Sequence, residues 1–565
     1  MKIDRFYTLV LIFAALAFLL STGAAVAKED NKIIHDAEHY ILKAQHVEKW
    51  AAEDKQIDEK LSEIRKKNGD KPPNIVYILV DDVGFGELGN PVLNRARGYK
   101  TPSISSLAKE GISLARMYTE PSCTPTRAAF LTGRIPSRNH MLEAKIVPPE
   151  GSGLNRDEVT IAEVLSKAGY NTAHIGKWHQ GDIREAMPHN QGFDSASFPM
   201  HNQATFGLMT ADAEAGGWAF NYSRRETEPN LRIDNSFRRY GWALGMDAQK
   251  GGEAHEWGTT PGDPANYSDA YYKKLNERYS KLVIEQLKSL AKRDKPFFLN
   301  YWPMIPLQFN RDKDGEYVTP NGGSQVESLR QLDENIGEIL AAIDALGIAD
   351  NTIVAVMGDN GAMMQAIPLS GFSDMIYRGG KGHTTEGGIR VDAFIRWPEV
   401  IETGSVAGDI VHVSDLFTTF ARVAQATQYI PTDRVIDGVD QLPLLLMGEG
   451  HGRRDYVHVY DGPKLAATIK QQYKVQWPSP GAAAWSMKIF DLFRDPRETI
   501  SLKTEMMWSV ESFKDMRIRH EAFKQKYPDR PETHGAPYEG IDNLRPETKE
   551  MLKAYYAKQK LLKQD

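Results

Sequence analysis

Short apolar runs alternate with helical segments along most of this 565-residue chain. Strands are predicted over residues 74–80 (NIVYILV), 170–175, 295–301 (KPFFLNY) and 352–357 (TIVAVM). Three of these are continuous apolar runs, typical of parallel strands that are covered on both faces. Helices are predicted between the strands, over residues 101–111, 160–169 and 324–346. This alternation predicts an α/β fold with a doubly wound, mostly parallel sheet and helices on both of its faces.

Flanking segments surround this central unit. The Pro- and Gly-containing stretch 68–73 (NGDKPP) is a clear boundary. The predicted organisation is a helical extension over residues 28–71, a large α/β domain over 72–425, a small antiparallel α+β subdomain over 426–502 and a peripheral helical tail over 503–565.

The sequence supports more specific predictions for the helical extension and for one stretch within the large domain. The extension predicts one or two helices that wrap the body, or else a coiled coil with a partner helix. Its apolar residues are spaced like one helical face: Ile33, Ile34, Ile41, Leu42, Val47 and Trp50. Residues 201–271 show no clean period and are expected to form an irregular insertion. Within it, Trp218 and Trp257 are expected to stack on a sugar or aryl ring of a ligand.

The first 27 residues have the pattern of a signal peptide. Lys2 and Arg5 precede an apolar run over residues 6–20, and residues 25–27 (AVA) offer a cleavage site. A retained anchor is the alternative, although the run is shorter than the roughly 20 residues that span a bilayer. The single Cys excludes a disulfide scaffold. We therefore expect a periplasmic or secreted protein without a membrane span once the segment is cleaved.

The net charge of the chain indicates whether its partner is a nucleic acid. The 69 Lys and Arg residues against 75 Asp and Glu residues give a net charge of −6. Nucleic-acid binding favours a basic surface, so this mild acidity argues against a nucleic-acid partner.

Paired oxygen-bearing side chains follow two of the predicted buried strands. Asp81 and Asp82 come directly after residues 74–80, and Asp359 and Asn360 follow the strand at 352–357. Because parallel strands bring their carboxyl ends to one edge of a sheet, four hard oxygen ligands meet there, which suits Ca²⁺ or Mg²⁺. The alternative is that these residues are ordinary turn and cap residues.

The cysteine lies at a predicted helix start. Cys123 begins the sequence CTPTR, and the helical pattern continues to Gly133. Backbone N–H groups at a helix N-terminus favour an anion. A buried small residue or a leftover thiol is the alternative for Cys123.

The motifs together resemble the sulfatase family. The stretch from Cys123 to Arg127, followed by Thr132-Gly133-Arg134, is similar to the family signature in which the cysteine becomes formylglycine. Further segments match family motifs in the expected order: Asp81-Asp82, 176–179 (GKWH), Asp359-Asn360, the Lys381-containing segment 377–398 and 491–496 (DLFRDP). The resemblance runs from about Pro72 to Leu502.

This resemblance implies an arylsulfatase-like sulfuric ester hydrolase of the alkaline phosphatase superfamily. It implies a formylglycine (3-oxoalanine) hydrate at position 123 as nucleophile, a bound Ca²⁺, with Mg²⁺ as the less favoured ion, and a formylglycine-generating maturation enzyme as partner. The implied metal ligands are Asp81, Asp82, Asp359, Asn360 and the modified Cys123. By the same resemblance, Arg127 supports the nucleophile, His179 helps to deprotonate the intermediate, and Lys177 and Lys381 bind the sulfate of a small sulfate ester or sulfated sugar.

One position departs from the family pattern. Sulfatases typically carry a P-H-x-P-like element after the strand at 295–301, whereas this chain has Pro303-Met304-Ile305-Pro306. Methionine has no proton to donate and binds anions weakly. Three interpretations are open: Lys381 serves as the acid for the leaving oxygen, a His of the insertion such as His201 or His255 does so, or the substrate has a good leaving group such as a phenol that needs little help.

Two other functions stay open at the level of sequence. Phosphonate monoester and phosphodiester hydrolases of the same superfamily share the C-x-P-x-R motif, the sheet and a divalent metal. A sulfate-ester binding protein without turnover is the other alternative, which Met304 motivates.

Overall fold

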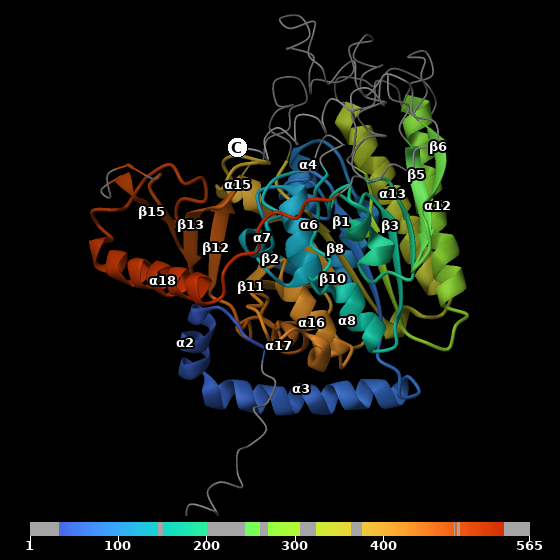
Figure 1. The fold of residues 1–565 in the computed structure, drawn as a ribbon, viewed down its shortest axis with the longest axis horizontal. Helices are drawn as coiled ribbons and strands as arrows, with labels where there is room; N and C mark the ends of the chain where they lie inside the picture. The colour runs from blue at the N-terminus through green and yellow to red at the C-terminus, as the bar shows by residue number, and fades with distance from the viewer. Residues whose placement is uncertain are drawn as a thin grey trace, which may run out of the picture.

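The computed structural model describes residues 33–144, 151–200, 243–259, 269–304, 324–362, 376–479, 481–482 and 486–535. Its centre is an 11-stranded sheet in the order β11-β2-β10-β8-β1-β7-β3-β4-β5-β6, with the short β9 beside β2 (Figure 1). The strands are β1 (Asn74–Val80), β2 (Ile112–Tyr118), β3 (Asn171–Gly176), β4 (Ser195–Phe198), β5 (Ala243–Gln249), β6 (His255–Thr259), β7 (Phe297–Trp302), β8 (Thr352–Gly358), β9 (Arg390–Val391), β10 (Ala393–Arg396) and β11 (Ser405–His412).

The middle of this sheet is parallel. β8, β1, β7, β3 and β4 run in one direction, and β10, β5 and β6 are antiparallel to their neighbours. The register pairs Val80 of β1 with Gly358 of β8, so both strands end at the same level. Acidic residues that follow the two strands therefore start from adjacent points of one sheet edge.

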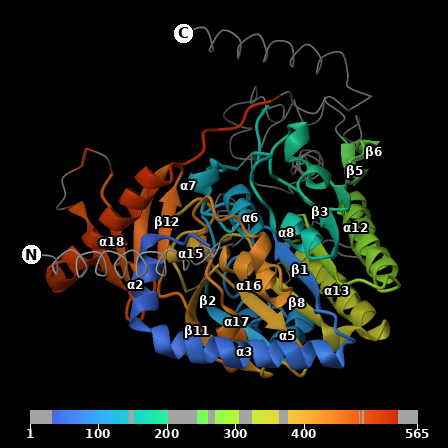
Figure 2. The same cartoon turned by 60° about the horizontal axis from the view of Figure 1, so that its bottom comes forward.

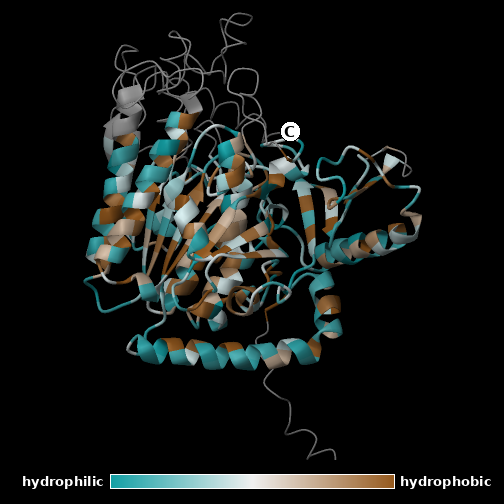
Figure 3. Ribbon diagram, turned by 180° about the vertical axis from the view of Figure 1, so that it is seen from behind, coloured by the Kyte–Doolittle hydropathy of each residue, from teal (hydrophilic) through white to brown (hydrophobic). Residues whose placement is uncertain are grey.

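Helices cover both faces of the sheet, as Figure 3 shows by the apolar strands enclosed between them. Along β1, Ile75, Tyr77 and Leu79 belong to one buried cluster, whereas Val76 and Ile78 belong to the other. The first face is covered by α6 (Cys123–Thr132), α8 (Ile161–Lys167), α16 (Asp415–Val423) and α17 (Leu442–Met447), and the second by α5 (Pro102–Lys109), α12 (Asp269–Leu290) and α13 (Ser324–Ala345). The predicted doubly wound fold is confirmed.

The N-terminal extension forms α2 (Ala37–Gln45) and the long α3 (Val47–Lys67), which lies across the body (Figure 2). Ile57, Leu61 and Ile64 recur at helical spacing and pack in the first buried cluster. The Arg422 guanidinium in α16 lies 2.7 Å from Asp54 and 3.1 Å from Asp58 of α3. The apolar face of α3 is thus used within this chain.

A second, antiparallel sheet follows in the order β12-β13-β14-β15, formed by β12 (Tyr456–Asp461), β13 (Lys464–Lys470), β14 (Tyr473–Gln476) and β15 (Lys488–Asp491). The helix α18 (Met507–Lys526) packs on it through Phe513 and Met516. Leu442 and Leu444 of α17 lie in the core of the large domain, so the antiparallel unit starts at Tyr456, later than the predicted boundary at residue 426. No helix within the described ranges is long and apolar enough to cross a membrane.

The insertion is more regular than its sequence indicates. Residues 243–259 form the hairpin β5–β6, which extends the main sheet, whereas 201–242, with Trp218, and 260–268 lie outside the described residues. Trp257 packs on Tyr279 of α12 with ring centroids 5.5 Å apart, and the Arg278 guanidinium lies 3.7 Å from its ring. Trp257 is thus packed against α12 and only partly buried, and its stacking on a ligand stays a prediction.

Candidate active site

Two pairs of residues, Asp81-Asp82 and Asp359-Asn360, meet at the ends of β1 and β8. The Asp82 backbone N–H donates to Asp359 Oδ1 at 3.0 Å, and Asn360 Nδ2 donates to Asp82 Oδ1 at 2.9 Å. Asp81, Asp82, Asp359 and Asn360 are at most 2% exposed. Asp82 has φ +57°, a left-handed conformation that is uncommon for non-glycine residues.

Three cations compensate these acids. Arg127 Nη2 lies 2.9 Å from Asp81 Oδ1 and 2.7 Å from Asp359 Oδ2. Lys177 Nζ lies 2.6 Å from Asp81 Oδ1, and all of these side chains are fully buried. Lys381 Nζ lies 2.6 Å from Asp82 Oδ1. Three carboxylates therefore face three cations, and the cluster is neutral when all six are charged.

A tight loop after β3 delivers Lys177. Gly176 has φ +97°, and a Cβ at this position would lie 2.0 Å from the carbonyl oxygen of Trp302, so the loop can approach the end of β7 because residue 176 is glycine. The Lys177 N–H donates to the same carbonyl at 2.8 Å. His179, buried and left-handed with φ +60°, follows in this loop, and its N–H donates to Met200 O at 2.8 Å.

A second loop delivers Lys381. The Lys381 N–H donates to Ala362 O at 2.8 Å, and the Gly382 N–H donates to Pro121 O at 2.7 Å, which ties this loop both to the end of β8 and to the approach to α6. The Lys381 side chain is 20% exposed, in contrast to the fully buried Lys177. Burial alone would lower the pKa of the Lys381 ammonium, but Asp82 outweighs burial and raises it well above its usual range. Lys381 is therefore a fixed positive charge at the more open side of the cluster.

Cys123 is the first residue of α6 and is fully buried. Its Sγ and one carboxylate oxygen each of Asp81 and Asp82 lie within 4.8 Å of one another. Burial raises the pKa of the Cys123 thiol, so the unmodified side chain is held as the neutral thiol at neutral pH. An unmodified cysteine at this position is a poor nucleophile.

The donor set fits a hard divalent cation. Asp81 Oδ2 and Asn360 Oδ1 are buried and have no hydrogen-bond partner among the described residues. Burial and the neighbouring Asp81 raise the pKa of Asp359 although Arg127 lies 2.7 Å from it, so a further positive charge beside this carboxyl would favour its ionised form. Oxygen ligands of this kind are those of Ca²⁺ and Mg²⁺. A divalent cation would give the neutral cluster a net positive charge, which favours binding of the sulfate monoester anion and of the sulfate dianion that hydrolysis releases.

The structure narrows the candidates for a leaving-group acid. Met304 follows β7, is 3% exposed and packs in the apolar cluster on the α12–α13 face. His255 lies exposed on β6, five strands from β1, which is about 24 Å at the usual strand spacing. His255 as the acid is therefore wrong for this structure. His201 lies outside the described residues, and of the named side chains Lys381 is the one placed in the cluster.

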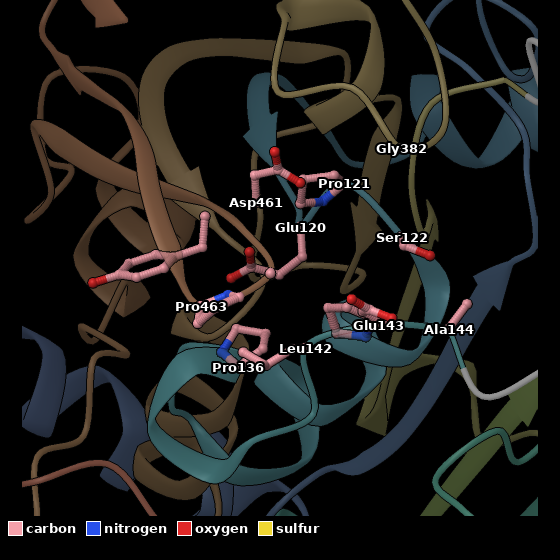
Figure 4. A pocket seen from close by; sticks show the side chains of 13 residues that line it. Glu120, Pro121, Ser122, Pro136, Leu142, Glu143, Ala144, Gly382, Asp461 and Pro463 are labelled. Atoms are coloured by element: carbon pink, nitrogen blue, oxygen red, sulfur yellow. The ribbon is translucent and has the colours of Figure 1, made fainter. Parts of the chain in front are cut away.

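A cavity of about 370 Å³ opens beside the cluster (Figure 4). Ser122 and Pro125, which flank Cys123, and Gly382, which follows Lys381, contribute to its wall. Glu120, Glu143 and Asp461 line it as well, and Figure 4 shows these three acids around the space. No basic side chain is among the described residues that line it. The cavity thus presents an acidic, hydrogen-bond-accepting wall next to chain neighbours of Cys123 and Lys381.

Several contributors to the site were missed at the level of sequence. Trp302, at the end of β7, lies with its ring centroid 4.8 Å from the Arg127 guanidinium. Gln180 Nε2 donates to Thr124 O at 3.2 Å and so fastens the Lys177 loop to α6. Asp461 is the last residue of β12 in the small sheet. A Trp at a strand end and a Gln next to the GKWH stretch were available signals, whereas the approach of Asp461 depends on tertiary packing.

Comparisons with known proteins agree with this geometry. The sulfatase family model matches residues 73–426. The chain is 32% identical over 418 residues to N-acetylgalactosamine-6-sulfatase of Mus musculus, covering 72% of each protein. It is 33% identical over 473 residues to steryl-sulfatase of Rattus norvegicus, covering 75% of this chain and 78% of that protein.

Solved structures share the fold. The PsFucS1 sulfatase from Pseudoalteromonas sp. superposes with a TM-score of 0.72 at 27% identity, covering 85% of this chain and 96% of that one. Phosphonate monoester hydrolase of Agrobacterium radiobacter is a more distant neighbour, with a TM-score of 0.50 and 18% identity over 79% of this chain and 96% of that one, and this likeness shows the fold alone. By family match, identity and coverage, the chain belongs to the sulfatases, which hydrolyse sulfate esters.

Proposed function

We propose that this protein is an exported, Ca²⁺-dependent sulfatase whose nucleophile is formylglycine made from Cys123. The observation that carries the proposal is the meeting of Cys123 with Asp81 and Asp82 within 4.8 Å, at the N-terminus of α6. The hydrated aldehyde supplies a hydroxyl nucleophile, and a divalent cation lowers the pKa of that hydroxyl. Asp81, Asp82, Asp359 and Asn360 are the side chains that would hold the cation.

The remaining residues of the cluster bind and orient the sulfate group. Lys177 and Lys381 project from separate loops toward the acids, and each would turn one ammonium to the sulfate oxygens when the cation takes over its carboxylate. Arg127, held by Asp81, Asp359 and the Trp302 ring, keeps a positive charge beside position 123. Fixed cations around a developing sulfuryl charge are the largest contribution that such a site makes to catalysis.

The substrate that we propose is a sulfated sugar. Its sulfate would lie at the cations, and its ring in the cavity lined by Glu120, Glu143 and Asp461. Carboxylates accept hydrogen bonds from hydroxyl or amino groups, and they repel further anionic groups. A ligand with one sulfate and several free hydroxyls fits this wall better than a polysulfated one.

The first test is the mass of the tryptic peptide that contains Cys123, from protein produced in a host with a formylglycine-generating enzyme. Conversion lowers the mass of the peptide by about 18 Da, and hydration restores it. The expected result is the aldehyde together with release of sulfate from a sulfate ester. Cys123→Ala, which cannot be converted, is the matched control. An unmodified thiol in fully active protein would overturn the proposed nucleophile.

Two further measurements test the remaining parts. Rates on matched aryl sulfate, phosphodiester and phosphonate esters separate a sulfatase from the phosphonate monoester hydrolase alternative, and sulfate is expected to be preferred. The substrate proposal predicts that Asp461→Asn raises KM for a monosulfated sugar while leaving KM for a small aryl sulfate unchanged. Export predicts that the mature N-terminus is Lys28 and that the protein fractionates with the periplasm or medium, whereas cytoplasmic full-length protein contradicts it.

A further inference from the structure

Two groups of metal-type ligands occur among the described residues, and one lies outside the active site. It consists of Asp36, just before α2, His458 in β12 and His520 in α18. One ligand atom of each residue lies within 4.8 Å of those of the others. Helix α2 of the N-terminal extension lies beside α18 and the small sheet (Figure 1), and the three side chains come from these elements and the residue before α2. They are 2%, 6% and 1% exposed.

The inward-facing atoms have the spacing of a metal site. Asp36 Oδ2 lies 2.9 Å from His520 Nδ1 and 3.7 Å from His458 Nε2, which is beyond hydrogen-bond length. Zinc binds nitrogen and oxygen at about 2.0–2.1 Å in a tetrahedron, so two ligand atoms lie about 3.3 Å apart. The two observed distances bracket this value. His458 Nε2 is buried without a hydrogen-bond partner among the described residues, so an imidazole nitrogen is left open toward the cluster.

The outward-facing atom of each ligand is held by a second residue. His520 Nε2 lies 2.6 Å from the Tyr460 hydroxyl, and His458 Nδ1 lies 3.1 Å from Thr468 Oγ1. Asp36 Oδ1 accepts from Arg138 Nη2 at 3.3 Å. Metal-binding histidines and carboxylates characteristically have such outer partners, which fix the ring orientation and the tautomer.

The charge balance also allows a cation. Arg138 is fully buried, and its Nε lies 3.0 Å and 2.9 Å from the two Asp437 carboxylate oxygens. With Asp36 ionised and both histidines neutral, the carboxylates of Asp36 and Asp437 carry one more negative charge than the Arg138 guanidinium balances. The cluster can therefore accept a further positive charge, either a proton on a histidine or a metal ion.

We propose that Asp36, His458 and His520 bind one structural Zn²⁺, with a water molecule as the fourth ligand. Imidazole and carboxylate ligands suit zinc, whereas the oxygen ligands of the active site suit Ca²⁺. The ion would join residues 484 positions apart in a chain whose single cysteine excludes an internal disulfide. Its role is to fasten the N-terminal extension to the small C-terminal unit.

The test uses the full chain, purified without a histidine tag or chelator, with zinc and calcium measured separately by mass spectrometry. The expected result is about one zinc per chain, falling at least tenfold in His458→Gln and His520→Gln. His255→Gln, which removes an exposed histidine on β6, is the matched control and keeps its zinc. Zinc added to metal-free protein is expected to saturate at one equivalent and to raise Tm.

Cobalt substitution of the wild type keeps the test independent of how the variants fold. Co²⁺ added to metal-free protein is expected to give the absorption bands of a tetrahedral site, and one equivalent of Zn²⁺ is expected to abolish them. Folded wild-type protein that takes up neither ion, or glutamine variants that fold and retain zinc, would overturn the proposal. The cluster would then be a proton-sharing Asp–His pair. Sulfatase activity is not part of the readout, so either result leaves the proposed function standing.

Discussion

Lys381 holds both carboxylate oxygens of Asp82, with Nζ 2.6 Å from Oδ1 and 2.8 Å from Oδ2. The two residues are 299 positions apart, and the loop of Lys381 is fixed by the backbone of Ala362 and Pro121. The carboxylate that we propose as a cation ligand is therefore the same one that restrains the ammonium that we propose as a sulfate ligand. A cation at Asp82 would compete with Lys381 and would release it for an anion.

This competition predicts that cation and sulfate binding are coupled. Adding Ca²⁺ is expected to tighten sulfate binding to the modified enzyme, by roughly 5- to 150-fold, the usual range for coupled sites. Calorimetric titration of sulfate with and without Ca²⁺ measures the factor, at constant ionic strength set with NaCl. Reciprocity requires that sulfate tighten Ca²⁺ binding by the same factor. Equal sulfate affinity in both conditions would show that the lysines are not released by the cation.

The two lysines are expected to contribute to the chemical step. Lys177→Ala and Lys381→Ala should each lower kcat/KM by about 10²–10³, the loss typical of one charge-stabilising group. Lys55→Ala, on the exposed side of α3, is the control and should leave kcat/KM unchanged. A loss in Lys177→Ala accompanied by a loss of folded protein in circular dichroism would indicate a structural role for Lys177.

Met304 predicts a steep dependence on the leaving group. Without a histidine after β7, turnover should fall as the pKa of the leaving alcohol rises across a series of aryl and alkyl sulfates. Met304→His is expected to flatten this dependence, with a gain of about tenfold or more on poor leaving groups and none on nitrophenyl sulfate. It should also lower Tm, because Met304 lies in an apolar cluster. Met304→Leu is the isosteric control, and an unchanged slope in Met304→His would show that proton donation does not limit this enzyme.

A buried ion cluster joins the two sheets and predicts a pH-dependent stability. Lys474 Nζ in β14 lies 3.2 Å from Glu386 in α15 (Glu386–Ile389) and 3.0 Å from Glu498, all fully buried. Burial alone would raise the pKa of Glu386, but Lys474 and Arg390 outweigh it and hold the pKa below its usual range. Lys474→Ala should lower the free energy of unfolding by about 3–5 kcal/mol, because buried Glu498 loses its ammonium partner and Glu386 keeps only Arg390.

The sign of the pH effect follows from the lowered pKa of Glu386. Its contribution to stability is present above the pKa of an unfolded Glu, about 4.3, and is lost as the pH falls below that value. The difference between wild type and Lys474→Ala should therefore be largest near neutral pH and shrink on acidification. Denaturant unfolding at pH 7 and pH 4 measures it, with the exposed Lys488→Ala as control. A difference that grows on acidification would contradict this assignment.

The parallel core and the acidic cluster after β1 and β8 could be predicted from the sequence because both depend on local patterns. The apolar run at 74–80 and the acids after it fix a strand and its carboxyl end, and the parallel register then brings Asp81 beside Asp359. The helix beginning at Cys123 has a Pro in its first turn and a left-handed Gly133 after its last residue, both of which are readable from one sequence.

The edges of the fold were less predictable because their signals are tertiary. β5 reads ALGMDAQ, and its buried residues Met246 and Ala248 alternate over too short a stretch to mark a strand without its partner. Trp257 is of a residue type that often stacks on ligands, yet in this structure its ring packs on Tyr279 and against the backbone at Gly245. The start of the small unit was placed too early because the apolar face of α17 gives no sign of which sheet it covers.

The position of α3 also determines how much of the chain must be synthesised before this helix can dock. This helix is among the first segments to be synthesised, but its partners come much later, since 399 residues separate Asp54 from Arg453, to which it is paired at 2.7 Å. At 5–20 residues per second, α3 waits about 20–80 s for them. During that interval Ile57, Leu61 and Ile64 have no core to cover, so a stalled or truncated chain presents a hydrophobic stripe near its N-terminus. Docking of α3 therefore requires the chain to be made at least as far as Arg453, and an exposed apolar stripe of this kind is prone to aggregation until then.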